Sequence, residues 1–67
     1  MKTLIEAECG EHRYMTSARA CDYAKNNPKE DVYVKHNGIQ AKVYENSFAG
    51  DISEKLYLLH ELNRLNK

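Results

Sequence analysis

The clearest pattern of apolar and polar positions lies on either side of the dipeptide Asn37-Gly38. Two segments that alternate between apolar and polar residues, 32–36 and 39–44, flank it. Asn-Gly favours a type I′ turn, because both of its residues tolerate a positive φ, and the twist of this turn matches that of the flanking strands. The sequence therefore predicts a β-hairpin with a two-residue loop. The expected register pairs 36 with 39, 34 with 41 and 32 with 43.

This register sorts the hairpin side chains onto two faces, and the two strands agree on which face is apolar. The face expected on the core carries Val32, Val34, His36, Ile39, Ala41 and Val43. The opposite face carries Tyr33, Lys35, Gln40, Lys42 and Tyr44. Agreement between the turn and the alternation makes the hairpin the most strongly specified element of the chain.

Two further patterns precede the hairpin. Residues 3–9 alternate, with Ile5, Ala7 and Cys9 on one face and glutamates on the other, which is typical of a half-buried strand. A helix is expected to begin after Thr16 or Ser17 as the N-cap and to end near Asn26, before a proline. Its inner face would carry Ala18, Cys21 and Ala24, with Ala20 and Tyr23 beside them.

A second helix is expected after the hairpin. Asp51-Ile52-Ser53-Glu54 is typical of a capping box, with Asp51 as the N-cap, and the helix should reach about Asn66. Phe48 is expected to close one end of the core. The helix has two apolar flanks, one of Ile52, Leu56 and Leu59 and the other of Leu58, Leu62 and Leu65. Together they cover about half of its circumference, more than an ordinary surface helix needs.

The order of elements is β-α-β-β-α, which predicts an α+β fold. We expect a three-stranded sheet that includes the Asn37-Gly38 hairpin, with two helices packed on one of its faces. The 67 residues leave room for one core, so residues 1–67 are expected to form a single domain.

Charge and cysteine content narrow the classes of partner. Ten Lys and Arg balance ten Asp and Glu, whereas proteins that bind nucleic acid through its backbone need a cationic surplus. We therefore expect neither a general polyanion binder nor a membrane protein, since no apolar run approaches the ~18 residues of a membrane span. Two cysteines are too few for a disulfide scaffold, and a cytoplasmic location with free thiols is expected.

Metal and nucleophile chemistry have only weak signals. Cys9-x-x-His12 has ligand spacing, and Cys21, His36 and His60 could join it, but structural zinc usually takes two closely spaced pairs. A cysteine paired with His12 could act as a nucleophile. However, a chain this short has little room for a substrate pocket, and the common catalytic motifs are missing. We expect a non-enzymatic protein without a metal or cofactor.

The first part of the chain resembles the front half of the HPr-type phosphocarriers. The resemblance covers about residues 3–44: a strand, Gly10-Glu11-His12, a helix and an Asn-Gly hairpin. In that family the histidine lies at a helix N-terminus, where backbone N–H groups can hold a phosphate. The resemblance implies a phosphate site at His12, with Arg13 as the nearest cation.

The chain departs from the family pattern at several positions. The family has an arginine two residues after the histidine, followed by a proline, and here Tyr14 and Met15 occupy these positions. The family also has a fourth strand between its last two helices, for which this chain is too short. A phosphocarrier-type or phosphate-binding module is thus an alternative hypothesis.

The polar face of the hairpin suggests a second alternative. Tyr33 and Tyr44 could stack on bases, and Lys35 and Lys42 could contact phosphates, as in a binder of single-stranded nucleic acid. The strand at 3–9 would add Glu6 and Glu8 to this face, where they would pair with the lysines. We therefore expect a solvated face with cross-strand pairs.

The apolar surplus of the last helix favours a third reading. Leu58, Leu62 and Leu65 follow the 4-3 spacing of a helix–helix seam. They either pack on the first helix or remain exposed for a partner. We expect a non-enzymatic protein-binding or regulatory module that uses this helix to contact another protein or a second copy of itself. The Tyr33, Lys35, Lys42 and Tyr44 face is a further candidate contact.

Overall fold

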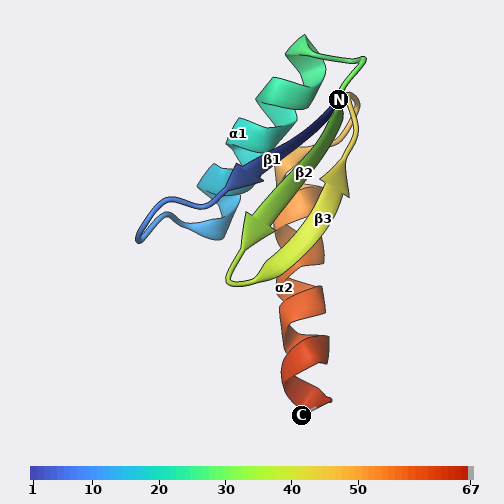
Figure 1. The fold of residues 1–67 in the computed structure, drawn as a ribbon. Helices are drawn as coiled ribbons and strands as arrows, with labels where there is room; N and C mark the ends of the chain where they lie inside the picture. Colours follow the sequence, from blue (N-terminus) through green and yellow to red (C-terminus); the bar gives the residue numbers. More distant parts are fainter. Residues whose placement is uncertain (67) are drawn as a thin grey trace.

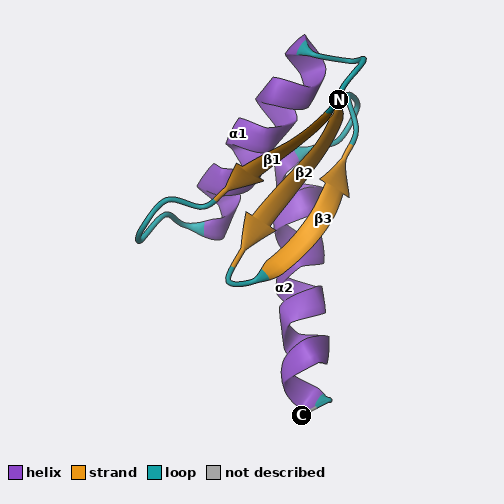
Figure 2. Cartoon of the chain, viewed as in Figure 1, coloured by secondary structure: helices purple, strands orange, loops and turns teal. Residues whose placement is uncertain are grey.

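The chain places both helices on the same face of a mixed three-stranded sheet (Figures 1 and 2). In the computed structural model, which describes residues 1–66, the elements are β1 (Lys2–Glu6), α1 (Arg13–Asn26), β2 (Asp31–His36), β3 (Ile39–Val43) and α2 (Ala49–Leu65). The strand order is β1-β2-β3, with β1 parallel and β3 antiparallel to β2. The predicted α+β fold with the order β-α-β-β-α is confirmed.

The hairpin forms with the predicted register. His36 pairs with Ile39, and the other cross-strand pairs follow as expected. Asn37 and Gly38 have φ values of 52° and 77°, the positive values that the type I′ turn requires. The helix-facing side chains of this hairpin form the floor of the core. The buried apolar residues are Ala20, Ala24, Val32, Val34, Ala41, Val43, Ile52 and Leu56.

Helix α1 begins earlier than the sequence predicts. His12 is its N-cap, and the imidazole Nδ1 accepts a hydrogen bond of 3.0 Å from the backbone N–H of Tyr14. The prediction of Thr16 or Ser17 as the N-cap is wrong, because both lie inside the helix and are fully buried. The Ser17 hydroxyl donates to the Arg13 carbonyl oxygen, one turn back. The Thr16 hydroxyl shares its proton between the Glu11 carboxylate and the His12 carbonyl oxygen, so both hydroxyls are satisfied without acting as a cap.

Strand β1 is shorter than the alternation of residues 3–9 predicts. Its last pair is Glu6 with Lys35, and the N–H of Ala7 donates to the Lys35 carbonyl at 2.9 Å. Beyond this point β2 ends, so the chain has no neighbouring strand to pair with. It turns instead at Gly10, which has a φ of 78°. Cys9 is consequently exposed and does not belong to an apolar strand face.

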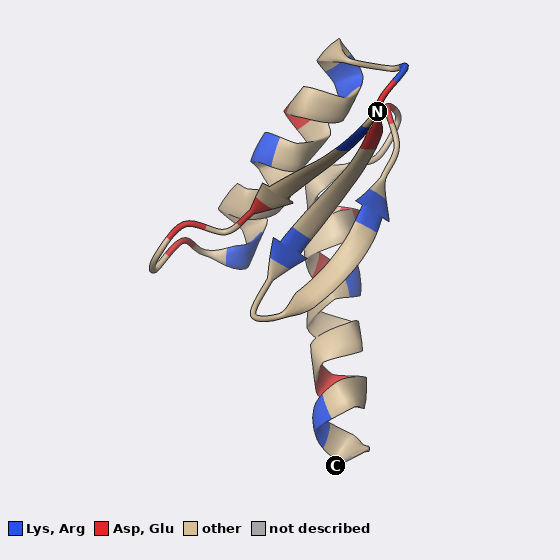
Figure 3. Ribbon diagram, in the orientation of Figure 1, with Lys and Arg blue, Asp and Glu red and all other residues tan. Residues whose placement is uncertain are grey.

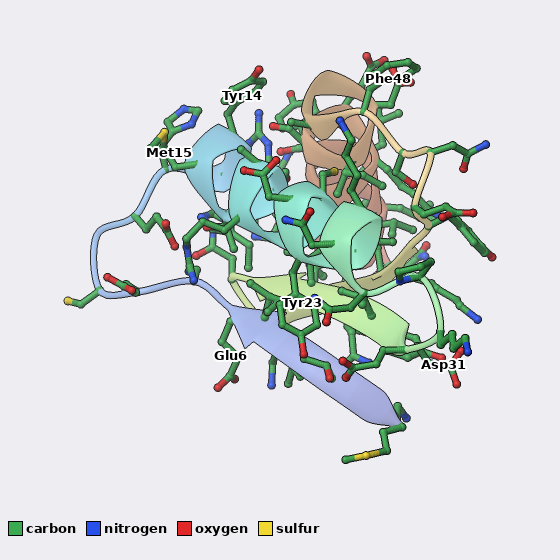
Figure 4. All side chains as sticks on the ribbon, turned by 90° about the horizontal axis from the view of Figure 1, so that it is seen from above. Glu6, Tyr14, Met15, Tyr23, Asp31 and Phe48 are labelled. Atoms are coloured by element: carbon green, nitrogen blue, oxygen red, sulfur yellow. The ribbon has the colours of Figure 1, made fainter. Side chains whose placement is uncertain are left out.

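The start of α2 also differs from the prediction. Phe48 is the N-cap and makes no side-chain cap bond, whereas Asp51 lies within the first turn. The helix begins before Asp51 because the N–H of Ile52 already donates to the Phe48 carbonyl at 3.0 Å. Phe48 does not close the core: it is 72% exposed and lies with Tyr14 and Met15 on the side of the helices opposite the sheet (Figure 4).

Candidate protein-binding surface

Helix α2 extends beyond the sheet that supports it. Its C-terminal half continues past the tip of the hairpin (Figure 1), and the molecule measures 36 Å along its longest axis against 21 and 19 Å along the others. The buried residues of α2 are Ile52, Ser53 and Leu56, all in the first half of the helix. No residue of the second half is fully buried, and Leu59 is only partly buried there, so the sheet covers this half incompletely. Neither helix in the described part of the chain has the length and hydropathy of a membrane-spanning segment.

Leu58, Leu62 and Leu65 form the leucine flank of α2. They are 56%, 57% and 71% exposed, so the predicted apolar flank does not pack on α1. The side of α2 that meets α1 carries other residues. The Arg13 Nε donates to the Ser53 Oγ at 3.0 Å, and the guanidinium lies 5.1 Å from the centre of the Tyr57 ring.

Two shallow grooves border the leucine flank. The first has a volume of about 380 Å³ and is lined by Asp51, Glu54, Lys55, Leu58, Leu59 and Leu62. The second, of about 340 Å³, lies between α2 and the hairpin and is lined by Gly38, Ile39, Gln40, Leu59, Leu62, Asn63 and Asn66. Leu59 and Leu62 belong to both grooves. Sequence reasoning assigned Leu59 to the inner flank only, although Leu59 lies next to Leu62 around the helix, which indicated its place here.

Charges are unevenly distributed along α2 (Figure 3). Asp51, Glu54 and Lys55 line the first groove at its N-terminal end. Farther along the helix, Glu61 and Arg64 pair with each other at 2.7 Å. The hydrogen bond from Arg64 lowers the pKa of Glu61. The groove beside the hairpin has no charged lining residue among those described; its lining combines leucines and Ile39 with the amides Gln40, Asn63 and Asn66.

Most charged side chains on the open face of the sheet contact other side chains of the same face. Lys42 lies 3.5 Å from Asp31 and its ammonium is 5.4 Å from the Tyr44 ring centre. Lys35 lies 4.0 Å from Glu6, as expected of a cross-strand pair, whereas Glu8 follows β1 and is not part of the sheet.

The ring of Tyr33, in the middle strand of the sheet, has two lysine ammonium groups near it. Lys2, from the neighbouring strand, lies 4.9 Å from the ring centre, and Lys42 lies 6.0 Å from it. The sequence reasoning did not include Lys2, although the alternation of β1 could have placed it there. A stacking base would have to displace these ammonium groups from the ring.

The alternative phosphate residues have different surroundings. His12 is exposed at the N-terminus of α1, but its Nδ1 already accepts the Tyr14 N–H. Arg13 is engaged with Ser53 and Tyr57 of α2. The cation that the family resemblance would assign to a phosphate thus holds the two helices together.

A carboxylate network fixes the loop between β1 and α1. Glu11 accepts hydrogen bonds from Arg19, from the Thr16 hydroxyl and from the Glu8 N–H. The hydrogen bond from Arg19 is the main reason that the pKa of Glu11 falls to about 2. His36 joins this region through its Nε2, 3.1 Å from the Glu11 carbonyl oxygen. These contacts hold the His12 segment in place.

Metal and thiol chemistry have no assembled site within residues 1–66. No three His, Cys, Asp or Glu side chains there come together as metal ligands. Both cysteines are free; Cys9 is exposed and Cys21 is half-buried. Burial, with a contribution from Asp22, raises the pKa of the Cys21 thiol, which lowers its reactivity as a nucleophile.

The chain matches no family model, no curated protein and no solved structure. The surface itself is therefore the basis for inferring a function. Ten large apolar or aromatic side chains are exposed within residues 1–66, and four of them, Tyr57 and the leucine flank, lie on α2. Helix α1 carries two, Tyr14 and Met15. Helix α2 therefore carries more of these exposed side chains than any other helix or strand of the described chain.

Proposed function

We propose that this protein is a non-enzymatic protein-binding module that docks on its partner through the leucine flank of α2. The observation that supports this proposal is the exposure of all three leucines, each by more than half, on a helix that extends beyond its own sheet. Contiguous exposed apolar surface with a polar rim is typical of interaction sites. Asp51, Glu54 and Lys55 supply that rim.

The leucine flank is large enough to anchor a complex. Full burial of an exposed leucine contributes about 1.5–3 kcal/mol. Each leucine of the flank still has more than half of its surface to bury, so the three together contribute roughly 3–5 kcal/mol. Association costs about 4–15 kcal/mol in lost freedom. The flank therefore acts as the anchor, and neighbouring backbone or polar groups must supply the rest of the affinity.

Fewer observations support the two alternative hypotheses, a phosphate site at His12 and a nucleic-acid site on the sheet. A phosphate site at His12 would lack Arg13, which contacts α2. A nucleic-acid site on the sheet would use tyrosine rings that already have lysine ammonium groups beside them. The leucine flank has no comparable partner in the described chain.

A capture experiment with matched variants tests the proposal. The wild-type protein, the double variant Leu58→Glu/Leu62→Glu and the control Met15→Glu would be used to recover partners from cells that express the protein. Met15 is a suitable control because it is 56% exposed, as Leu58 is, but lies on α1. All three should have the same circular dichroism spectrum.

We expect the double variant to lose at least about tenfold of the recovered partner, equivalent to about 1.4 kcal/mol or more. The control should recover it as the wild type does. Equal recovery by all three proteins would contradict the proposal.

A further inference from the structure

Strand β3 is an end strand of the described sheet and has an open edge. In an antiparallel ladder, consecutive residues point their N–H and C=O groups alternately toward and away from the partner strand. The type I′ turn makes His36 and Ile39 a hydrogen-bonded pair. Gln40 and Lys42 consequently point their backbone groups outward. No hydrogen bond from residues 1–66 reaches these outward groups of Gln40 and Lys42.

The opposite edge of the sheet is less open. At the end of β1, the outward carbonyl oxygen of Glu6 accepts a hydrogen bond of 2.8 Å from Arg19 Nη2. Arg19 is itself fixed by its ion pair with Glu11, at 2.7 Å. Strand addition is therefore obstructed at the end of β1 and unobstructed along β3.

The open edge of β3 and the leucine flank form one continuous surface. Leu59 and Leu62 line the same groove as Ile39 and Gln40 of β3. The side of α2 that carries Ser53 and Tyr57 faces α1 instead, through Arg13. A partner that pairs with β3 would thus also reach the leucine flank.

We propose that the occupant of this surface is a second copy of the chain. The β3 strands of the two copies pair antiparallel about a two-fold axis at Ala41, which joins the two sheets into one of six strands. The leucine flanks of the two α2 helices meet beneath it. This inference rests on the proposed function, because it names the partner of the same surface.

The side chains of β3 suit this pairing. With Ala41 at the axis, Gln40 of one copy lies opposite Lys42 of the other, so two outward residues on each strand give four backbone hydrogen bonds. A register with Lys42 at the axis would instead bring two ammonium groups together, which is unfavourable. In the chain itself, Asp31 draws the Lys42 ammonium to the open sheet face, which leaves the edge backbone accessible.

The charges of α2 favour the same arrangement. The two-fold axis makes the helices antiparallel, so the N-terminal end of one flank, with Asp51, Glu54 and Lys55, faces the C-terminal part of the other, where the charges of Glu61 and Arg64 pair with each other. A parallel arrangement would place acidic side chains against their own copies. The formal net charge of zero also removes long-range repulsion between two copies.

The available surface is sufficient for such a dimer. A standard interface takes about 800 Å² from each partner, which is about one sixth of the 4786 Å² surface of this molecule. The edge of β3 and the 17 residues of α2 lie along one side of a molecule that is 36 Å long. An interface of this size requires only that side.

Sedimentation and amide hydrogen exchange test the inference on the intact chain. We expect twice the monomer mass of 7.8 kDa at high concentration, with the amides of Gln40 and Lys42 protected in the dimer and exchanging freely on dilution. Gln40→Pro removes an outward N–H without removing a bond to β2, and Gln40→Ala is its control. The proline should weaken dimerisation at least about tenfold, and alanine by less than about threefold.

The outcomes separate this inference from the proposed function. A dimer whose Gln40 and Lys42 amides exchange freely would overturn the β3 pairing. A monomer from about 1 µM to about 1 mM would overturn the second copy as partner. In both cases the proposed function stands if the Leu58→Glu/Leu62→Glu variant recovers less of a partner protein than the wild type does. If the variant and the wild type recover the same amount, the proposed function is contradicted together with this inference.

Discussion

The two helices lie on the same face of the same sheet but differ in the size of the side chains that they pack against it. Helix α1, with 14 residues, places Ala20 and Ala24 on the core and lies close to the strands. Helix α2, with 17 residues, places large leucines around half of its circumference, and its fully buried residues all lie in its first half. Small side chains allow close approach on a narrow sheet, whereas leucines need a depth of packing that three strands do not supply along the whole helix.

The polar groups show the same contrast. On α1, the buried hydroxyls of Thr16 and Ser17 and the Arg19 side chain all have partners within the chain. Among the described residues, no buried side-chain nitrogen or oxygen lacks a hydrogen-bond partner. On α2, by contrast, the groups without a partner in the described chain are the exposed apolar side chains of the leucine flank.

The strongest test of the contrast lies within α2. Leu56 is 1% exposed and Leu62 is 57% exposed. We expect Leu56→Ala to lower the free energy of unfolding by about 2–5 kcal/mol, enough to unfold much of so small a domain. Leu62→Ala should change it by less than about 0.5 kcal/mol in dilute solution. Urea denaturation measures both, and equal losses would show that the second half of α2 is packed after all.

A substitution on α1 tests the close approach of that helix. Ala20 is fully buried between α1 and the sheet, so Ala20→Leu should overpack the core and cost about 1–3 kcal/mol. Ala18→Leu is the control, because Ala18 is only partly buried. Thermal unfolding compares them, and an Ala20→Leu variant as stable as the wild type would mean that α1 does not lie close to the sheet.

The cap of α1 offers a smaller effect. His12→Ala removes the acceptor for the Tyr14 N–H and should cost about 1 kcal/mol. His12→Asn should restore most of this loss, since asparagine is a good N-cap residue. Chemical denaturation of the three proteins measures the difference. If alanine proved as stable as histidine, the imidazole would have no capping role and would be free for other chemistry.

Acid should weaken the loop that Glu11 fixes. The pKa of Glu11 falls from an ordinary 4.5 to about 2 in the folded chain. The stability it contributes is therefore complete above about pH 4.5 and lost as the pH falls toward 2. Glu11→Gln should flatten this part of the pH–stability curve. The pH dependence that remains in this variant comes from groups such as Glu30, whose pKa is lowered by hydrogen bonds from Thr3 and Tyr23. An unchanged curve would contradict the assignment.

The hairpin could be predicted because two independent signals agreed on it. Asn37-Gly38 determines the register, and the alternation of both strands fits only that register. The N-cap of α1 could not be predicted, because Thr16 and Ser17 are better cap residues than His12 by type, and only the fold shows that their hydroxyls bond inside the helix. Cys9 was misplaced because the length of β1 depends on where β2 ends.

Part of the candidate site could likewise be predicted from a local pattern, and part depended on the tertiary structure. Helical periodicity alone identified Leu58, Leu62 and Leu65 as a flank. Whether α1 would cover them depended on how far the sheet and α1 extend along α2, which is a property of the tertiary structure. The position of Ile39 and Gln40 beside Leu62 likewise follows from the packing of the hairpin on α2, and no local pattern indicates it.

Site-specific photo-crosslinking tests the central claim most directly. A photoreactive residue would be placed at position 62 on the leucine flank or at position 15 on α1, where the native side chains are 57% and 56% exposed. In cells that express the protein, position 62 should form one dominant adduct with a protein, of twice the monomer mass if the partner is a second copy, and position 15 should not. Equal labelling at the two positions, or no adduct at position 62, would contradict the assignment of the leucine flank as the binding surface.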